Sequence, residues 1–510
     1  MQKVTKVFYI SLAISVLFII WGLVPPEVSP NWNLDHVTTL IQGFLVTRFG
    51  WFYLLVTTAF LIFAIFLIVS KYGNIVLGKD GDKPEYNYLT WFGMLFSAGM
   101  GIGLVFWGAA EPIHHFHTSP YDTATEAEAA RVAMQYSFFH WGFHPWAVFA
   151  TIALALAYFQ FRKEEPGLIS STLKPLFGDK MNGGLGTFIN VIAVFATVFG
   201  VATSLGLGAQ QIGSGLEFIT GNIPNTIGIQ MIIIAIVTVL YMTSALTGLN
   251  KGIKILSTSN VVIAILLMLF LLFTGPTNFI MNFFTTTLGR YVSYLPEMSF
   301  RMAPFNEENA SWLQSWTIFY WAWWIAWAPF VGMFIARVSK GRTVREFVTG
   351  VLLVPTLFGA LWFSVFGGSA IHLEVNQAVD IAGIIKESGT EAALFSVLDN
   401  FPLSGIMAAL AILLISSFFI TSADSATFVL GMQTTNGDLN PAMKVKVVWG
   451  LVQSGTAAVL LWQGGLSALQ TASIIAAFPF AIIMIMMVIS IFKAFREEAK
   501  VYSLKRKKRE

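Results

Sequence analysis

Residues 97–103 read Ser-Ala-Gly-Met-Gly-Ile-Gly and interrupt an otherwise apolar stretch that runs from residue 91 to residue 110. The three glycines, Gly99, Gly101 and Gly103, each cost about 1 kcal/mol of helix propensity relative to alanine. A stretch of about 20 apolar residues can cross a bilayer, so the glycine run would break a spanning helix. Broken backbone at that depth is tolerated only where protein buries it or a watery cavity meets it. The run therefore predicts a binding site at a helix break or, equally, the close packing of two helices.

The whole chain shares this apolar character. Of its 510 residues, 56% are hydrophobic and only 11% are charged, and the mean hydropathy is +0.70. In soluble domains roughly a quarter of the residues are charged, so most of this chain belongs in lipid. The sequence predicts an all-α polytopic membrane protein with 12 transmembrane helices, near residues 7–24, 50–70, 91–110, 138–160, 185–217, 229–247, 254–274, 312–336, 347–370, 404–430, 445–463 and 467–492.

The distribution of Lys and Arg predicts the orientation of these spans. Positive residues collect in cytoplasmic segments close to the membrane. With both termini in the cytoplasm, all but five of the 30 Lys and Arg residues fall on the inner side. The five outer residues are Arg48, Arg131, Arg290, Arg301 and Lys386. We expect a multi-pass protein of the plasma membrane with a retained first helix and both ends inside.

Carriers of this length are often built from two inverted repeats, whose interrupted helices meet near the bilayer midplane. Spans three to seven and eight to twelve would form two inverted five-helix repeats of the LeuT-like kind, preceded by two additional helices. We expect the connector between the repeats to be amphipathic and interfacial, because aromatic residues alternate there with polar ones. The predicted boundaries are 1–90 for the additional helices, 91–275 and 312–495 for the repeats, 276–311 for the connector and 496–510 for a basic cytoplasmic tail.

Tryptophan gathers at membrane depth in the eighth span. At about 100° per residue, Trp323, Trp324 and Trp327 fall on one face of a helix, whereas Trp321 points elsewhere. A quaternary ammonium has no N–H to donate, and ring faces bind it at about 0.5–2 kcal/mol per ring. The fourth span adds Trp141, Trp146 and Phe149. The pattern favours an aromatic cage for such a cation, and aromatic packing between helices is the alternative.

The tenth span carries a dense group of hydroxyl residues between Ser416 and Thr427. Hard cations such as sodium take oxygen ligands, which in carriers with broken helices come from hydroxyls and freed carbonyls. The alternative is that each hydroxyl bonds back to the carbonyl one turn before it. Asp424, in the same span, is a functional candidate because ionisable groups are costly at this depth, and a structural role is equally open.

Other features restrict the function. No cysteine and no phosphate-binding loop occurs in the sequence, so thiol chemistry and nucleotide-driven transport are excluded. We expect His114, His115 and His117 to lie exposed in an outer loop. A serine hydrolase using Ser369 is a remote alternative, and we expect no enzyme and no organic cofactor. The basic tail favours anionic lipid over nucleic acid as its partner.

Several motifs resemble those of the betaine/carnitine/choline transporter family. They are the run from Ser315 to Trp324, the Gly-Met-Gly-Ile-Gly run followed by Glu111-Pro112, His140-Trp141-Gly142 with Trp146, and Thr421-Ser422-Ala423-Asp424-Ser425. The resemblance covers residues 7–495 and implies two inverted five-helix repeats and a homotrimer.

The resemblance also implies specific site residues. Trp141, Trp146, Trp323, Trp324 and Trp327 match the aromatic substrate box, and Phe149 stands where sodium-coupled relatives carry Tyr. The backbone at Met100, Gly101 and Gly103 lies in the substrate site, and choline-type relatives tend to carry Asp at the position of Gly103. The sodium site nearer the substrate matches the carbonyls of Ser97, Met100 and Phe418 and the hydroxyls of Thr421 and Ser422. Thr197 and Phe330 match part of a second sodium site, in which Val201 replaces a second Thr.

These residues together predict a secondary transporter that imports the compatible solute glycine betaine by sodium symport, for osmoprotection. Na⁺ is then the coupling ion. The alternatives are a sodium-independent exchanger of carnitine-like betaines and a carrier for choline, ectoine or proline.

Overall fold

The computed structural model describes residues 4–99, 101–247 and 250–507. In these ranges the chain forms helices joined by loops, and one isolated bridge between Val76 and Thr343 is the only strand-like pairing there. The all-α prediction is therefore confirmed. The α-helices are α1 (Lys6–Gly22), α2 (Leu34–Val69), α3 (Tyr88–Gly99), α4 (Ile102–His117), α5 (Glu126–Trp141), α6 (Phe143–Ala157), α7 (Lys174–Phe177), α8 (Gly184–Thr220), α9 (Ile227–Thr247), α10 (Asn250–Thr274), α11 (Thr277–Phe300), α12 (Glu307–Leu313), α13 (Phe319–Val338), α14 (Val344–Gln377), α15 (Ile381–Ser388), α16 (Ala393–Leu398), α17 (Ser404–Thr434) and α18 (Met443–Lys507).

The glycine run breaks its helix as predicted. α3 ends at Gly99 and α4 begins at Ile102, with Gly101 in an extended conformation as the residue before α4. Two other long helices are also interrupted. Gly142 separates α5 from α6, and Gly464 and Gly465 leave helical geometry inside α18, where Gly465 adopts a left-handed φ of +57°.

In the described residues, each of the twelve predicted spans falls on one helix or on successive helices, and the number of spans stays a prediction. In the part of the chain that the structure describes, nine helical stretches are long and apolar enough to cross a membrane. That number counts α18 once across its kink and leaves out the shorter α1 and the two halves α3 and α4. The second span was placed too late, because α2 begins at Leu34 and not near residue 50.

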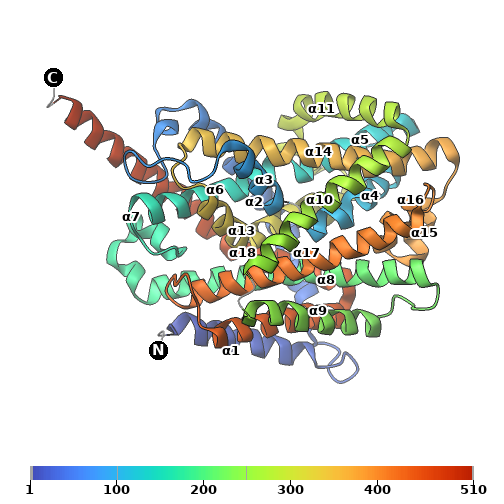
Figure 1. The fold of residues 1–510 in the computed structure, drawn as a ribbon, viewed down its shortest axis with the longest axis horizontal. Coiled ribbons are helices and arrows are strands. Elements are labelled where there is room, and N and C mark those ends of the chain that lie inside the picture. The colour runs from blue at the N-terminus through green and yellow to red at the C-terminus, as the bar shows by residue number, and fades with distance from the viewer. Residues whose placement is uncertain (1–3, 100, 248–249, 508–510) are drawn as a thin grey trace.

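The long helices run roughly along the longest axis of the molecule, with α8 in the interior (Figure 1). α8 packs against α13, α17 and α18. α8 closely approaches the backbone of α13 at Gly200, where an added Cβ would lie 2.8 Å from the carbonyl carbon of Ala326. Any larger residue at this position would force α8 and α13 apart. This contact brings α8 against α13, which carries most of the clustered tryptophans.

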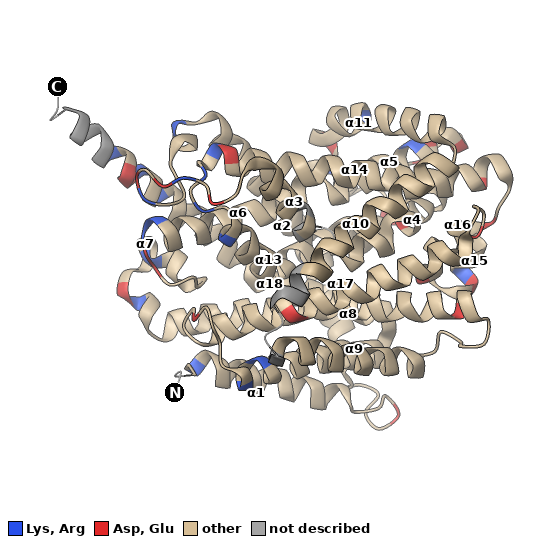
Figure 2. Ribbon diagram, viewed as in Figure 1, with Lys and Arg blue, Asp and Glu red and all other residues tan. Residues whose placement is uncertain are grey.

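Both termini lie at the same end of the molecule (Figure 1), and Lys and Arg residues gather around that end (Figure 2). At the opposite end, two segments that lie between predicted spans or just before one are helical. Residues 126–128 form the first turn of α5, which the side chain of Thr125 caps by accepting a bond from the Glu128 backbone N–H. Residues 374–399 contain the end of α14, then α15, a short 3₁₀ turn (Thr390–Ala392) and α16, and Glu391 is buried there.

The predicted connector at 276–311 is helical. Its main element is α11, which packs against α5 and α14. Tyr291 of α11 is buried, and its hydroxyl accepts a hydrogen bond from the backbone N–H of Phe143, directly after the α5–α6 break. α11 therefore supports the start of α6, whereas its position relative to the membrane surface stays a prediction.

Candidate functional site

Aromatic side chains from two parts of the sequence form one cluster. Trp141 ends α5, Trp146 and Phe149 lie on α6, and Trp323, Trp324 and Trp327 lie on α13. All six are buried. We call this group the aromatic cage.

The rings of the cage contact each other mostly edge to face. Trp141 meets Trp324 with 4.8 Å between ring centroids, and Phe149 lies 6.0 Å from both Trp324 and Trp327. Trp323 and Trp324 are stacked at 4.7 Å. Because the rings come from α5, α6 and α13, the cage depends on how these three elements pack.

Trp321 points away from the cage, as the helical spacing predicts. Its ring stacks on His144 at 5.2 Å and meets Phe139 edge to face at 5.0 Å. The face shared by Trp323, Trp324 and Trp327 is thus confirmed by the structure, while the role of these residues in binding stays a prediction.

The break between α3 and α4 lies directly against the cage. A Cβ added at Gly103 would lie 2.5 Å from Cη2 of Trp323 and 3.2 Å from Cη2 of Trp141. At Gly101 the nearest atom to an added Cβ would be Cη2 of Trp327, at 3.7 Å. The glycine run therefore both breaks a helix and permits close packing, because its backbone lies against the rings of α5 and α13.

A cavity of about 530 Å³ opens beside the cage at Trp327, between α3, α10, α13 and α17. It is lined by four of the five residues predicted for the first sodium site, which are Ser97, Phe418, Thr421 and Ser422. The fifth, Met100, lies outside the described residues. The structure thus brings Ser97 of α3 and three residues of α17 to one cavity.

The hydroxyl of Thr421 already has partners in this conformation. It donates to the carbonyls of Ser417 (3.0 Å) and Phe418 (3.3 Å) and accepts from Nδ2 of Asn260 (3.3 Å). Asn260, on α10, also accepts a bond from the Ser417 hydroxyl. Sequence reasoning missed Asn260, a buried amide in an apolar helix that faces α17.

Of the two residues predicted for a second sodium site, Phe330 lines the cavity beside the cage and Thr197 does not. The Thr197 hydroxyl donates to the carbonyl of Ala193 (2.8 Å) and lies 3.4 Å from Nε2 of Gln433 on α17. Phe330, one turn after Trp327, lines the cavity beside the cage and also a second cavity of about 620 Å³. Thr197 thus bonds to groups of α8 and α17, whereas Phe330 faces the two cavities.

The second cavity carries charged groups. Arg337, Lys340, Lys446, Glu85 and Asp424 line it. It shares Phe330, Phe334 and Ser425 with the cavity beside the cage, so the two adjoin. Asp424 therefore lines a cavity that adjoins the one beside the cage.

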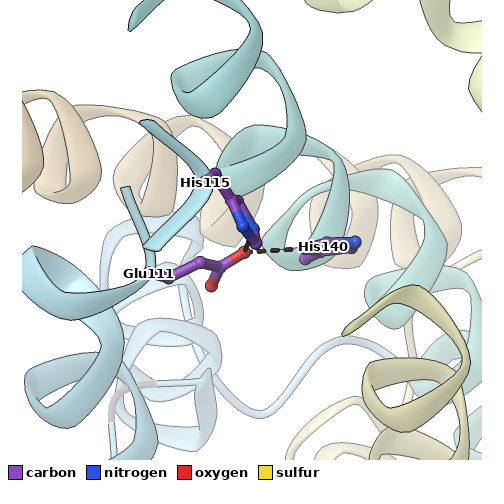
Figure 3. A group of neighbouring side chains, drawn as sticks. All are labelled: Glu111, His115 and His140. Atoms are coloured by element: carbon purple, nitrogen blue, oxygen red, sulfur yellow. Dashed lines mark hydrogen bonds and ion pairs between the residues drawn. The ribbon is translucent and has the colours of Figure 1, made fainter. Parts of the chain in front are cut away.

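A buried polar cluster on the other side of the cage was not predicted. The expectation of an exposed loop is wrong, because α4 continues to His117 and so contains all three histidines. His115 is fully buried and His114 is half-buried, whereas His117 is exposed. Glu111, His115 and His140 point toward one another (Figure 3). The side-chain nitrogen and oxygen atoms that could ligate a metal lie within 4.8 Å of each other. These are residue types that bind Zn²⁺, and here they are joined by hydrogen bonds. An acid and a histidine one helical turn apart were the available signal in the sequence.

The hydrolase alternative finds no support in the geometry. Ser369 is buried, and its hydroxyl makes no hydrogen bond in the described part of the chain. His372, the nearest histidine in sequence, packs its ring against Phe279 instead. A serine nucleophile needs a base within hydrogen-bond reach, and this pair does not provide one.

Comparison with known proteins identifies the family. The sequence profile described as "BCCT, betaine/carnitine/choline family transporter" matches residues 6–500. The chain belongs to the betaine/carnitine/choline transporter family. Members of this family are transporters, so this chain is a multi-pass membrane transporter and is not expected to be an enzyme.

Three relatives are similar over nearly their whole length. The chain is 54% identical to "Glycine betaine transporter OpuD" of Bacillus subtilis, covering 98% of this chain and 96% of the relative. It is 47% identical to a "Probable glycine betaine transporter" of Desulfitobacterium hafniense, covering 98% of each. It is 45% identical to an "Ectoine/hydroxyectoine transporter" of Virgibacillus pantothenticus, covering 95% of each.

Proposed function

We propose that this protein imports glycine betaine into the cell by sodium symport. The observation that carries the proposal is the aromatic cage packed against the broken α3–α4 helix. Ring faces bind the trimethylammonium group, and the free N–H groups at the start of α4 attract the carboxylate. The names of two close relatives support glycine betaine as the substrate.

The proposed coupling uses the cavity beside the cage. Sodium would be held by the carbonyls of Ser97, Met100 and Phe418 with the hydroxyls of Thr421 and Ser422. Four of these residues line one cavity that reaches Trp327, so an occupied sodium site would adjoin the cage. A sodium ion there would stabilise the same arrangement of α3, α13 and α17 that binds the substrate, which couples the two binding events.

The proposed orientation places both termini in the cytoplasm. The Lys and Arg residues around the end with the termini support it, because positive residues favour the cytoplasmic side. The charged second cavity would then be the inner exit. We also propose that the chain forms a homotrimer, as the family resemblance implies, and that its basic tail contacts anionic lipids.

The experiment that tests the proposal is equilibrium binding to the purified protein, measured by calorimetry in sodium chloride and in potassium chloride. We expect glycine betaine to bind at least tenfold more tightly in sodium, with weak competition by choline and proline. Equal affinity in both salts would contradict sodium coupling. Transport that requires internal substrate and ignores sodium would support a carnitine-type exchanger in its place.

Ectoine is a second candidate substrate, because one relative at 45% identity is named for it. Ectoine carries a delocalised amidinium cation and a carboxylate, so it suits the same cage and helix end. Competition between labelled glycine betaine and ectoine distinguishes them: the preferred substrate displaces the other at the lower concentration.

A further inference from the structure

The carboxylate of Glu111 lies at the centre of the buried cluster in Figure 3 and takes part in four hydrogen bonds. Oε1 is bonded to Nε2 of His115 (3.0 Å) and Nδ1 of His140 (2.7 Å). Oε2 accepts from Nε1 of Trp141 (2.8 Å) and from the hydroxyl of Tyr320 (2.5 Å). The cluster therefore joins α4, α5 and α13 around one acid.

These bonds suit an ionised carboxylate surrounded by neutral donors. Each imidazole needs only one N–H to bond Glu111, and the other nitrogen of His140 lies 2.9 Å from the hydroxyl of Thr317. Both histidines can thus stay neutral while the acid accepts all four bonds. The side chains of Glu111, His115 and His140 are fully buried.

An ionised Glu111 in this cluster has no Lys or Arg as an ion-pair partner among the described residues. In the described part of the chain, the ion-pair partners of Glu111 are the two histidines. A buried charge that no opposite charge compensates is costly. A cation bound close by would lower that cost.

The cage lies directly beside this charge. Trp141 donates its indole N–H to Glu111 and presents its ring to Trp324 at 4.8 Å. Tyr320, the other donor to Oε2, is stacked with Trp324 at 5.9 Å. A cation against these rings is thus separated from the carboxylate by about one indole. An N–H bonded to an anion also makes the ring more electron-rich, which strengthens its attraction for a cation.

We propose that Glu111 is the fixed counter-charge of the aromatic cage and makes the cage selective for cations, acting through Trp141 and Tyr320. The proposal rests on the proposed function, since it assigns the cage a quaternary ammonium. Glu111 is a positioning residue that bonds Trp141 of the cage and Tyr320 beside it, and it does not touch the substrate. Opposite unit charges roughly 9 Å apart, at an effective dielectric constant of about 20, change a binding constant roughly 20-fold.

The test compares glycine betaine with its uncharged isostere 3,3-dimethylbutanoate, in which carbon replaces the quaternary nitrogen. Affinities of both for the purified protein are measured by indole fluorescence at saturating sodium. Glu111→Gln keeps the size of the side chain and removes the charge. We expect it to weaken betaine binding by about 10- to 30-fold and isostere binding by less than about threefold. The ratio of betaine affinity to isostere affinity then falls by the fold-loss for betaine divided by the fold-loss for the isostere.

A structural role alone would weaken both ligands equally, and an unchanged preference would overturn the proposal. Glu111→Asp keeps the charge and should keep the preference. Glu111→Met is a second neutral variant, in case the amide does not fold. Glu391→Gln, a buried acid away from the cage, is the matched control and should leave the preference unchanged. Failure of the unaltered protein to bind betaine, or to prefer it to the isostere, would refute the proposed function and not the role of Glu111.

Discussion

Gly103→Ala tests whether the cage needs bare backbone at the helix break. The new Cβ would lie 2.5 Å from Cη2 of Trp323, about 1 Å closer than an ordinary carbon–carbon contact. Trp323 cannot turn away freely, because its ring is stacked on Trp324 at 4.7 Å and on Phe319 at 5.7 Å. Overpacking of this kind costs about 1–3 kcal/mol. If the closed cage is the state that binds substrate, betaine affinity should fall by about 5- to 150-fold.

The assay is calorimetric betaine binding to the purified variant at saturating sodium. Gly101→Ala is the matched control inside the site, because its Cβ would lie at an ordinary 3.7 Å from Trp327 and its backbone is extended. Gly43→Ala on α2 meets no atom within 4 Å and controls for the added methyl group itself. An affinity of Gly103→Ala within about threefold of the unaltered protein would refute the reasoning that the rings close on this glycine.

Further predictions concern the cage, the sodium site, the helix packing and the outer loops. Trp324→Leu should weaken betaine binding by a few kcal/mol in calorimetry, because several ring contacts loosen together, and a change below about threefold would make the indole mere packing. Thr421→Val should raise the sodium concentration needed for half-maximal uptake at least tenfold, since a ligand is lost, whereas an unchanged sodium dependence would mean that the hydroxyl only bonds back within α17. Gly200→Ala should lower the melting temperature in detergent, because α8 meets α13 there. Burial raises the pKa of Glu391, so protonation favours the folded state. The melting temperature should therefore rise as the pH falls from about 7 to about 5, and Glu391→Gln should abolish that part of the slope.

Local patterns in the sequence were enough for the helix break and the shared aromatic face. Alternating glycines lower helix propensity wherever they occur, and α3 indeed ends at Gly99. The angular spacing of Trp323, Trp324 and Trp327 depends only on helix geometry. Both features are properties of one short segment, which explains why the structure bears them out.

The features that sequence reasoning missed depend on tertiary packing. The third span was predicted to end near residue 110, yet α4 continues through Pro112 and buries His115 beside His140 of another helix. The pairing of Asn260 with Thr421 joins α10 to α17. The early start of α2 was missed because its first turns carry polar residues such as His36 and Arg48, which lower the local hydropathy.

The most direct test of sodium-driven betaine import is accumulation of labelled glycine betaine in proteoliposomes with an inward sodium gradient. We expect accumulation above the external concentration, which collapses when sodium is equal on both sides and does not need substrate inside the vesicles. Uptake that is indifferent to the sodium gradient and is stimulated by internal betaine would contradict the account.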